Sequence, residues 1–260
     1  MTNDNQSTYL QENRRYWNSV ADWWAPRGEA AWQRREPVWG IWGVPESEVQ
    51  LLPTSMQGLN AVELGCGTGY VGAWMARRGA VVTGIDLSER QLETARRLEA
   101  DHSLGVTFVH GNAEATPFAD ASFDFAISEY GAALWCDPYL WLREASRILK
   151  PDGRLVLWTQ HPFAYVTAPQ DGSLSTERLE RPYFGLRMLD WTTAAEDPGG
   201  MEFTLPLSGW FEALTAAGFV VERLLEPQAP STGPDEAFFV SRRWAQAYPS
   251  ELAFVAYKPG

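Results

Sequence analysis

One apolar segment, which ends in an acidic residue and runs into alternating glycines, constrains this chain more than any other feature. Residues 62–69 read Val-Glu-Leu-Gly-Cys-Gly-Thr-Gly, so Gly65, Gly67 and Gly69 follow directly after Glu63. Glycine lets the backbone turn tightly and lets a ligand approach without a Cβ in the way, as at the mouth of a parallel sheet. We therefore predict a buried strand that ends at a nucleotide-like cofactor.

The carboxylate of Glu63 indicates the charge of that ligand. A negative group beside the loop would repel the phosphate oxygens that backbone N–H groups attract in a dinucleotide site. The spacing of the three glycines also differs from Gly-x-Gly-x-x-Gly, the pattern of dinucleotide-binding domains. A positively charged ligand is therefore favoured, and a NAD-dependent oxidoreductase is the less favoured alternative.

Acid-x-Gly-x-Gly-x-Gly beside a cationic ligand resembles motif I of the class I methyltransferases, whose cofactor is S-adenosylmethionine (SAM). The resemblance implies that the acid and the loop hold the amino-acid end of SAM, and that S-adenosylhomocysteine is the product. The cofactor-binding residues that it implies in this segment are Glu63, Gly65, Cys66, Gly67, Thr68 and Gly69.

Two downstream segments extend the resemblance along the cofactor. Residues 80–86 indicate a second buried strand that ends at Asp86, about 20 residues after the glycines, where an acid binds a ribose diol. Residues 106–118 resemble the adenine-contacting loop of the family, with Asn112 in place of the usual Asp. An amide oxygen still accepts a hydrogen bond from the adenine amino group, but it carries no charge. The neighbouring residues implied in the site are Leu87, Ala113 and Glu114.

Residues 122–128 and 147–157 resemble strand four and the helix-turn-strand-five unit of the same family, and Ser128 joins the implied cofactor site. The resemblance is good over roughly residues 55–160 and loose elsewhere. It implies an α/β fold, a Rossmann-like sheet of seven mostly parallel strands with helices on both faces. The last strand, at residues 251–257, would run antiparallel between strand five and strand six, at residues 219–225.

Alternating strands and helices from residue 59 onward independently favour a parallel sheet covered on both faces. We expect a helix between Gly69 and Gly79, and a capping box at residues 88–91 that opens the next one. Asp137 and Pro138 would provide an N-cap and a first-turn proline for a helix that runs to residue 150. Further helices are expected over residues 208–218 and near residues 235–247.

The SAM-binding domain is predicted to comprise residues 54–260. Two segments are predicted to be additions to its framework: an N-terminal helical extension or lid at residues 1–53, and a pocket-shaping insertion after strand five at residues 160–206. The extension contains six of the thirteen tryptophans: Trp17, Trp23, Trp24, Trp32, Trp39 and Trp42.

These indoles either pack on the core or cover the cofactor, where aromatic faces stabilise a sulfonium and exclude water. By resemblance, Tyr16 would cover the cofactor, and Tyr9 and Trp17 would contact the acceptor.

Bulk composition narrows the partners. The net charge of −12 and the isoelectric point near 4.7 oppose nonspecific nucleic-acid binding. No apolar run approaches the length of a membrane span, and the first residues are polar, so a cytoplasmic location is expected. The two cysteines, Cys66 and Cys136, lack metal-binding spacing and are expected to be packing residues. We expect no metal, and the chain is expected to be a monomer or a homodimer.

Methyl transfer from a sulfonium is an in-line displacement, so the protein mainly aligns the nucleophile and keeps water out. A base helps only if the acceptor is protonated. His161 follows the apparent strand five at the carboxyl edge, where open sheets bind ligands, and is the candidate base. Its alternative is a structural hydrogen-bonding role. Glu129 and Tyr130, after strand four, would line the acceptor side or hold the methionine amino group.

The segment Ser128-Glu129-Tyr130-Gly131 stands where amide and nucleobase N-methyltransferases carry Asn/Asp-Pro-Pro-aromatic. The missing motif argues against DNA and RNA substrates. The Trp, Tyr and Phe content near the extension and the insertion predicts a small, apolar or aromatic acceptor, methylated at O, N or C, and the resemblance is to the group that includes quinone, sterol and natural-product methyltransferases. Two alternatives stay open: a SAM-site enzyme that does not transfer a methyl group, and a non-catalytic SAM-binding protein.

Overall fold

The computed structural model describes residues 3–196 and 198–260, so residues 1 and 2 of the predicted extension lie outside the described residues. Its helices are α1 (Asn3–Ser19), α2 (Ala21–Gln33), α3 (Glu46–Val49), α4 (Tyr70–Arg77), α5 (Glu89–His102), α6 (Gly131–Trp135), α7 (Pro138–Ile148), α8 (Pro162–Thr167), α9 (Leu207–Ala216) and α10 (Arg242–Ala245). The strands of the main sheet are β3 (Asn60–Leu64), β4 (Val81–Asp86), β5 (Thr107–His110), β6 (Phe123–Glu129), β7 (Leu149–Gln160), β10 (Val220–Leu225) and β13 (Glu251–Tyr257). Short hairpins are formed by β1 (Val38–Trp39) with β2 (Val44–Pro45), β8 (Met188–Asp190) with β9 (Met201–Phe203), and β11 (Glu236–Ala237) with β12 (Val240–Ser241).

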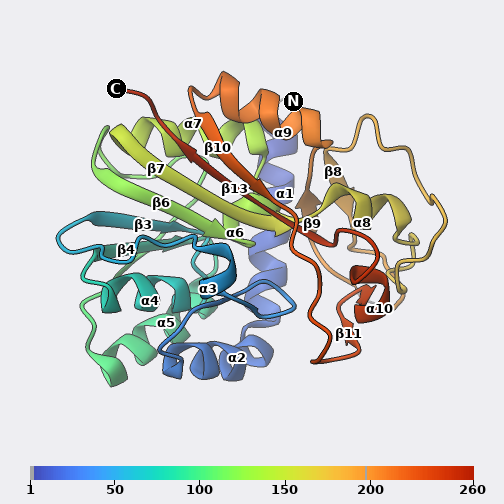
Figure 1. Ribbon diagram of the computed structural model, residues 1–260, viewed down its shortest axis with the longest axis horizontal. Coiled ribbons are helices and arrows are strands. Elements are labelled where there is room, and N and C mark those ends of the chain that lie inside the picture. The colour runs from blue at the N-terminus through green and yellow to red at the C-terminus, as the bar shows by residue number, and fades with distance from the viewer. Residues whose placement is uncertain (1–2, 197) are drawn as a thin grey trace.

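The seven main strands lie in the order β10-β13-β7-β6-β3-β4-β5. The pairs among β7, β6, β3, β4 and β5 are parallel, and β13 runs antiparallel to both β7 and β10. Helices α4 and α5 lie on one side of the sheet and α7 and α9 on the other (Figure 1). The predicted fold, including the antiparallel last strand between strands five and six, is confirmed.

Local sequence explains where two of these helices begin. The Ser88 side chain accepts a hydrogen bond from the N–H of Gln91 and caps α5. The Asp137 side chain accepts from the N–H of Tyr139 and caps α7, with Pro138 in the first turn. A side-chain cap satisfies an N–H group that has no partner within the helix. Both predicted helix starts are confirmed.

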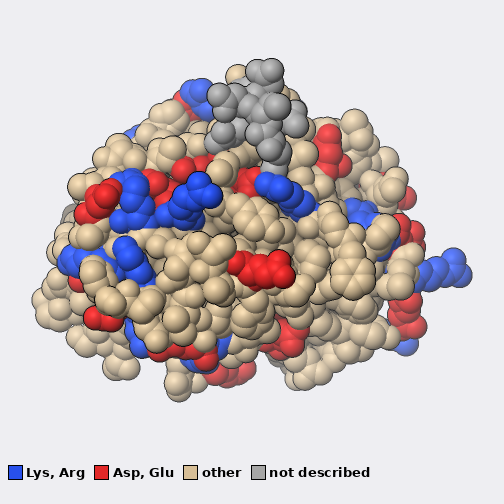
Figure 2. All heavy atoms as spheres, turned by 90° about the horizontal axis from the view of Figure 1, so that it is seen from above, with Lys and Arg blue, Asp and Glu red and all other residues tan. Residues whose placement is uncertain are grey.

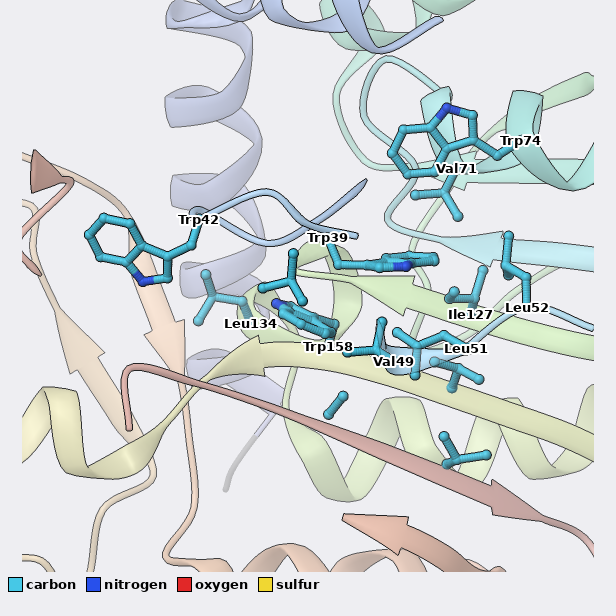
Figure 3. Close-up of a cluster of buried hydrophobic side chains, with 14 of the residues drawn as sticks. Trp39, Trp42, Val49, Leu51, Leu52, Val71, Trp74, Ile127, Leu134 and Trp158 are labelled. Atoms are coloured by element: carbon cyan, nitrogen blue, oxygen red, sulfur yellow. The ribbon is translucent and has the colours of Figure 1, made fainter. Parts of the chain in front are cut away.

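Tryptophans of the extension complete one face of the sheet. The Trp39 ring lies between those of Trp74 and Trp158, with ring centroids 5.7 and 6.3 Å away, in a cluster that includes Val71 and Ile127 (Figure 3). The opposite face is filled by the side chains of α7 and α9. The β1–β2 hairpin therefore forms part of the hydrophobic core beside the carboxyl edge of the sheet.

The region near residues 235–247 differs from its prediction as one helix. It forms the β11–β12 hairpin followed by the single turn of α10. Phe238, in the turn of the hairpin, has a φ of +53°, which a helix does not allow. Ser241 then caps α10 by accepting from the N–H of Trp244. Two short elements thus replace the expected helix.

The surface carries both signs of charge. Figure 2 shows Lys and Arg side chains lying beside Asp and Glu side chains on one face. Arg147, for example, pairs with both Asp120 and Glu144. No helix within the described residues is long and apolar enough to cross a membrane.

Candidate cofactor and acceptor site

The glycine loop after β3 is confined by backbone contacts. Gly65, Gly67 and Gly69 have φ angles of +73°, +51° and +77°, in the left-handed region that favours glycine. A Cβ on Gly65 would lie 2.5 Å from the backbone nitrogen of Ala132, and one on Gly131 would lie 2.1 Å from the carbonyl oxygen of Gly65. The loop and the start of α6 therefore approach each other closely only because both positions are glycine.

Glu63 lies beneath this loop. Its Oε2 accepts a hydrogen bond of 2.7 Å from the N–H of Gly72 in α4. Burial raises the pKa of Glu63 well above its ordinary value, and the nearby carboxylates of Glu129 and Asp86 raise it further. A cationic group bound beside these carboxylates would stabilise their ionised forms.

Asp86 lies at the end of β4, next to the loop. Its Oδ2 accepts from the N–H of Gly67 at 2.7 Å, and its Oδ1 accepts from the N–H of Ser88 at 2.8 Å. Burial raises the pKa of Asp86, and these backbone donors oppose that shift. After β5, the Asn112 side-chain oxygen accepts from the N–H of Glu114 at 2.9 Å, which holds this loop in a turn.

A cavity of about 380 Å³ connects these groups, within the range of roughly 300–1,000 Å³ that is typical of ligand sites. The predicted site residues that line it are Tyr16, Trp17, Glu63, Gly65, Cys66, Gly67, Thr68, Asp86, Leu87, Asn112, Ala113, Glu129 and Tyr130. The structure therefore brings together residues from α1, the glycine loop and the ends of β4, β5 and β6.

Three separate segments form the wall opposite the glycine loop: the extension, the insertion and the β11–β12 hairpin. Trp24 from α2 stacks on Phe238 from the hairpin, with ring centroids 6.0 Å apart and planes inclined by 17°. Trp135 is stacked against Tyr16 and packs its edge on Trp17. The insertion contributes Gly172, Trp191, Gly199 and Glu202. This half of the cavity is therefore largely aromatic.

The extension is also fastened to the glycine loop itself. The Trp32 indole N–H donates a hydrogen bond of 2.8 Å to the carbonyl oxygen of Thr68. A Cβ on Gly28 would lie 2.5 Å from the Thr68 hydroxyl oxygen, so α2 packs directly on the loop. Among the extension tryptophans, Trp32, Trp39 and Trp42 are buried, whereas Trp17 and Trp24 line the cavity.

Two glutamines of the site were not found by sequence reasoning. Gln91, in α5, and Gln160, at the end of β7, line the cavity, and each is at least 96% buried. The side-chain nitrogen of each lacks a hydrogen-bond partner among the described residues. Glutamine has no motif to mark it, although the position of Gln160 at a strand end is the usual place for a ligand contact. A bound ligand would satisfy both donors.

Some predicted site residues lie behind the cavity wall. The Tyr9 hydroxyl donates to the Glu114 carboxylate, 2.7 Å from each of its oxygens, and Glu114 also accepts from the N–H of Asp137. Ser128 donates to the carbonyl oxygen of Leu64, and Gly69 begins α4. These residues support the lining rather than form it.

The structure does not bring His161 into this cavity. Its Nδ1 accepts from the N–H of Phe163 at 3.0 Å and caps α8, and its Nε2 lies 2.9 Å from Oε1 of Glu226. It lies on the wall of a second, more open depression with Leu179 and Tyr248. Burial lowers the pKa of His161, and Glu226 opposes that shift. Both ring nitrogens therefore have structural partners.

The fold and the arrangement of the site are similar to those of class I SAM-dependent methyltransferases. Residues 62–157, which include the glycine loop, Asp86 and Asn112, match the family described as a methyltransferase domain. A solved SAM-dependent methyltransferase from Mesorhizobium loti is 25% identical, with a TM-score of 0.66, over 84% of this chain and all of that one.

Two curated relatives are methyltransferases of small or carrier-bound molecules by name. A malonyl-[acyl-carrier protein] O-methyltransferase from Erwinia pyrifoliae is 40% identical over 39% of this chain and 37% of its own length. A ubiquinone biosynthesis O-methyltransferase from Dinoroseobacter shibae is 28% identical over 61% of this chain and 66% of its own. The chain thus spans about a third to two thirds of these relatives.

Proposed function

We propose that the protein transfers the methyl group of SAM to a small, largely apolar or aromatic acceptor. The observation that carries this proposal is the single cavity with two chemically different halves. One half is built from the glycine loop, Asp86 and the Asn112 turn, and the other from aromatic side chains of three separate segments. A cofactor and an acceptor can therefore lie next to each other in one enclosed space.

The residues present fit SAM. Asp86 would bind the ribose hydroxyls, and the turn at Asn112 would contact the adenine. Glu63 and Glu129 would face the ammonium group of the methionine end, because both carboxylates line the cavity, Glu63 buried and Glu129 partly buried. SAM, when bound, supplies the electrophilic methyl group. The unpartnered amide nitrogen of Gln91 supports a polar ligand in this half.

The second half of the cavity supports the choice of acceptor. Trp24, Trp191, Phe238 and Phe239 offer apolar rings, while Glu202 and Gln160 are polar groups that would orient the acceptor. We propose that residues 1–53 act as a lid, since Trp24 closes on Phe238 across the cavity. The stacked pair would exclude water, which competes with the acceptor for the methyl group. A cavity of this size favours a small molecule over a nucleic acid.

Calorimetric titration with SAM, S-adenosylhomocysteine and NAD, run in parallel, tests the cofactor. We expect both SAM compounds to bind in the micromolar range and NAD not to bind. Replacing Asp86 with alanine removes charge-assisted hydrogen bonds, so SAM affinity should fall about 10- to 100-fold. Binding of NAD alone would refute the proposal. A screen for acceptor-dependent release of S-adenosylhomocysteine then separates a methyltransferase from a protein that only binds SAM.

A further inference from the structure

Tyr130 is held in an unusual conformation at the carboxyl edge of β6. Its φ and ψ angles are 57° and −42°, and a positive φ is rare for a bulky side chain. Such strain persists where the surrounding structure imposes it, and it is common at functional sites. Here it accompanies a side chain that lines the cavity, with a hydroxyl that donates a 2.5 Å hydrogen bond to Oε1 of Glu251.

Glu251 begins β13 and lies directly opposite Gln160 of β7. Its side chain is fully buried on the face of the sheet that carries Trp158. Besides the Tyr130 hydroxyl, Oε1 accepts from the indole N–H of Trp158 at 2.7 Å and from the backbone N–H of Ile41 at 3.0 Å. Oε2 is buried without a hydrogen-bond partner among the described residues. The three donors all converge on Oε1, so Oε1 is the oxygen that the Tyr130 proton can reach.

The surroundings of Glu251 favour proton uptake near neutral pH. Burial raises the pKa of Glu251 to about 7, although Tyr130, Trp158 and Ile41 act in the opposite direction. Glu129, on β6 beyond the intervening β7, raises it further. The other titratable groups of this network are Tyr70 of α4 and Tyr165 of α8, whose pKa values are themselves raised by burial. A carboxyl group with such a pKa suits general-base chemistry.

We propose that Tyr130 accepts the proton of the acceptor's hydroxyl group and passes its own phenolic proton to Glu251. The inference rests on the proposed function and deepens it. Tyr130 is then a catalytic residue, because it touches the acceptor, and Glu251 is a positioning residue that acts through it. Because the Tyr130 hydroxyl donates to Glu251, its oxygen lone pairs are left to accept a hydrogen bond from the cavity side.

The step balances in atoms and charge. With SAM bound, the bond between its methyl carbon and sulfur would break as a bond between that carbon and the acceptor oxygen forms. The proton of the acceptor hydroxyl moves to the Tyr130 oxygen, and the phenolic proton moves to Glu251. The positive charge of the sulfonium and the negative charge of the carboxylate both disappear, and Glu251 later returns the proton through the Tyr130 hydroxyl to the cavity.

The chemistry points to a phenol as the acceptor class. Burial and the nearby carboxylates raise the pKa of Tyr130 above the ordinary value near 10, so Tyr130 releases its proton only as it gains one from an acceptor hydroxyl, for which a phenol is acidic enough. The aromatic half of the cavity matches a phenol ring. Glu129 also lies at this edge, where it lines the cavity and accepts from the N–H of Gly40 and the hydroxyl of Tyr70. We assign Glu129 to the cofactor.

Two phenols of different acidity test the relay. 2-Naphthol stays protonated near neutral pH, whereas 4-nitrophenol ionises by itself at mildly alkaline pH. Release of S-adenosylhomocysteine is measured against pH for the wild type, Glu251→Gln and Tyr130→Phe. With 2-naphthol, the wild-type rate should rise through an apparent pKa of about 7, and both variants should lose about 100-fold in kcat together with this pH step.

With 4-nitrophenol at mildly alkaline pH, the same variants should lose less than about fivefold, because no proton has to be removed from an ionised acceptor. An equal loss with both phenols would mean that the two residues are structural, and would overturn the proposal. Persistence of the pH step in Glu251→Gln would do the same.

Calorimetry separates this inference from the proposed function. Both variants should bind SAM within about twofold of the wild type, since neither residue is assigned to the cofactor. A wild-type protein that binds SAM but methylates neither phenol would overturn the phenol inference alone. A wild-type protein that does not bind SAM would overturn the proposed function. Glu222→Gln, which changes an exposed glutamate paired with Arg154 on β10, is the matched control and should leave every measurement unchanged.

Discussion

Replacing Glu251 with glutamine should stabilise the protein, and the gain should depend on pH. In the unfolded chain a glutamate ionises near 4.5, whereas in the folded protein burial raises the pKa of Glu251 to about 7. The folded state therefore binds the proton more tightly. The free energy of unfolding of the wild type falls as pH rises through this window, and the loss is complete above pH of about 7.

The size of this effect follows from the shift. A change from 4.5 to about 7 corresponds to about 3 kcal/mol, because one pKa unit is worth about 1.4 kcal/mol. Glutamine keeps an oxygen that can accept from Tyr130, Trp158 and Ile41, but it does not titrate. The advantage of Glu251→Gln over the wild type should therefore grow by about 3 kcal/mol between pH of about 4 and about 8.

Urea unfolding of both proteins at several pH values measures this difference. Glu63, Asp86 and Glu129 also have raised pKa values and change the stability of both proteins with pH, so only the difference between the two isolates Glu251. A difference that stays constant across the range would refute the reasoning, and so would a variant that is less stable than the wild type at alkaline pH. An acid whose ionised form lowers the stability of the folded protein, as we expect for Glu251, is typical of a functional site.

The remaining predictions concern the lid, His161 and the cofactor charge. Phe238→Ala removes one ring of the stack with Trp24, so we expect the acceptor KM to rise about tenfold while SAM affinity changes little. Kinetics measures the KM and calorimetry measures the SAM affinity. Phe184→Ala, at a side chain that is 84% exposed, is the control for both. His161→Ala removes the cap of α8 and the Glu226 contact, so the free energy of unfolding should fall by about 1 kcal/mol. We expect kcat to change less than about threefold. A loss of about 100-fold in kcat would restore His161 as the candidate base. SAM binding should release protons, because a bound cation lowers the raised pKa of Glu63. The binding enthalpy measured by calorimetry should therefore depend on the ionisation enthalpy of the buffer. A binding enthalpy that is the same in every buffer would contradict this prediction.

The residues on the glycine-loop side of the cavity could be brought together from the sequence because their determinants are local. The glycine turn, Asp86 and Asn112 each follow a strand end directly, and parallel strands bring their carboxyl ends to the same edge. The main strands were likewise predictable from apolar runs. The starts of α5 and α7 were predictable from the helix caps Ser88 and Asp137.

The acceptor half was less predictable because it is assembled from distant segments. Trp24 and Phe238 are more than 200 residues apart, and no local pattern indicates that their rings stack. His161 follows the end of β7, where open sheets usually bind ligands. The chain turns into α8 at this point, however, and the His161 ring caps that helix. Glu251 could not be singled out as more than the first residue of the last strand, because only the sheet order reveals its proximity to Tyr130.

The extension contributes to the polar network as well as to the lid. The turn between β1 and β2 donates the N–H of Gly40 to Glu129 and the N–H of Ile41 to Glu251. Gly40 has a φ of +68°, and a Cβ there would lie 2.0 Å from Oε1 of Glu251, so this approach requires glycine. Without the turn, the buried carboxyl group of Glu251 and the partly buried one of Glu129 would each lose a donor, which is costly in a low-dielectric interior. The segment proposed as the lid therefore also holds Glu129 and Glu251 in place, so the proposed lid and the proposed proton relay depend on the same segment.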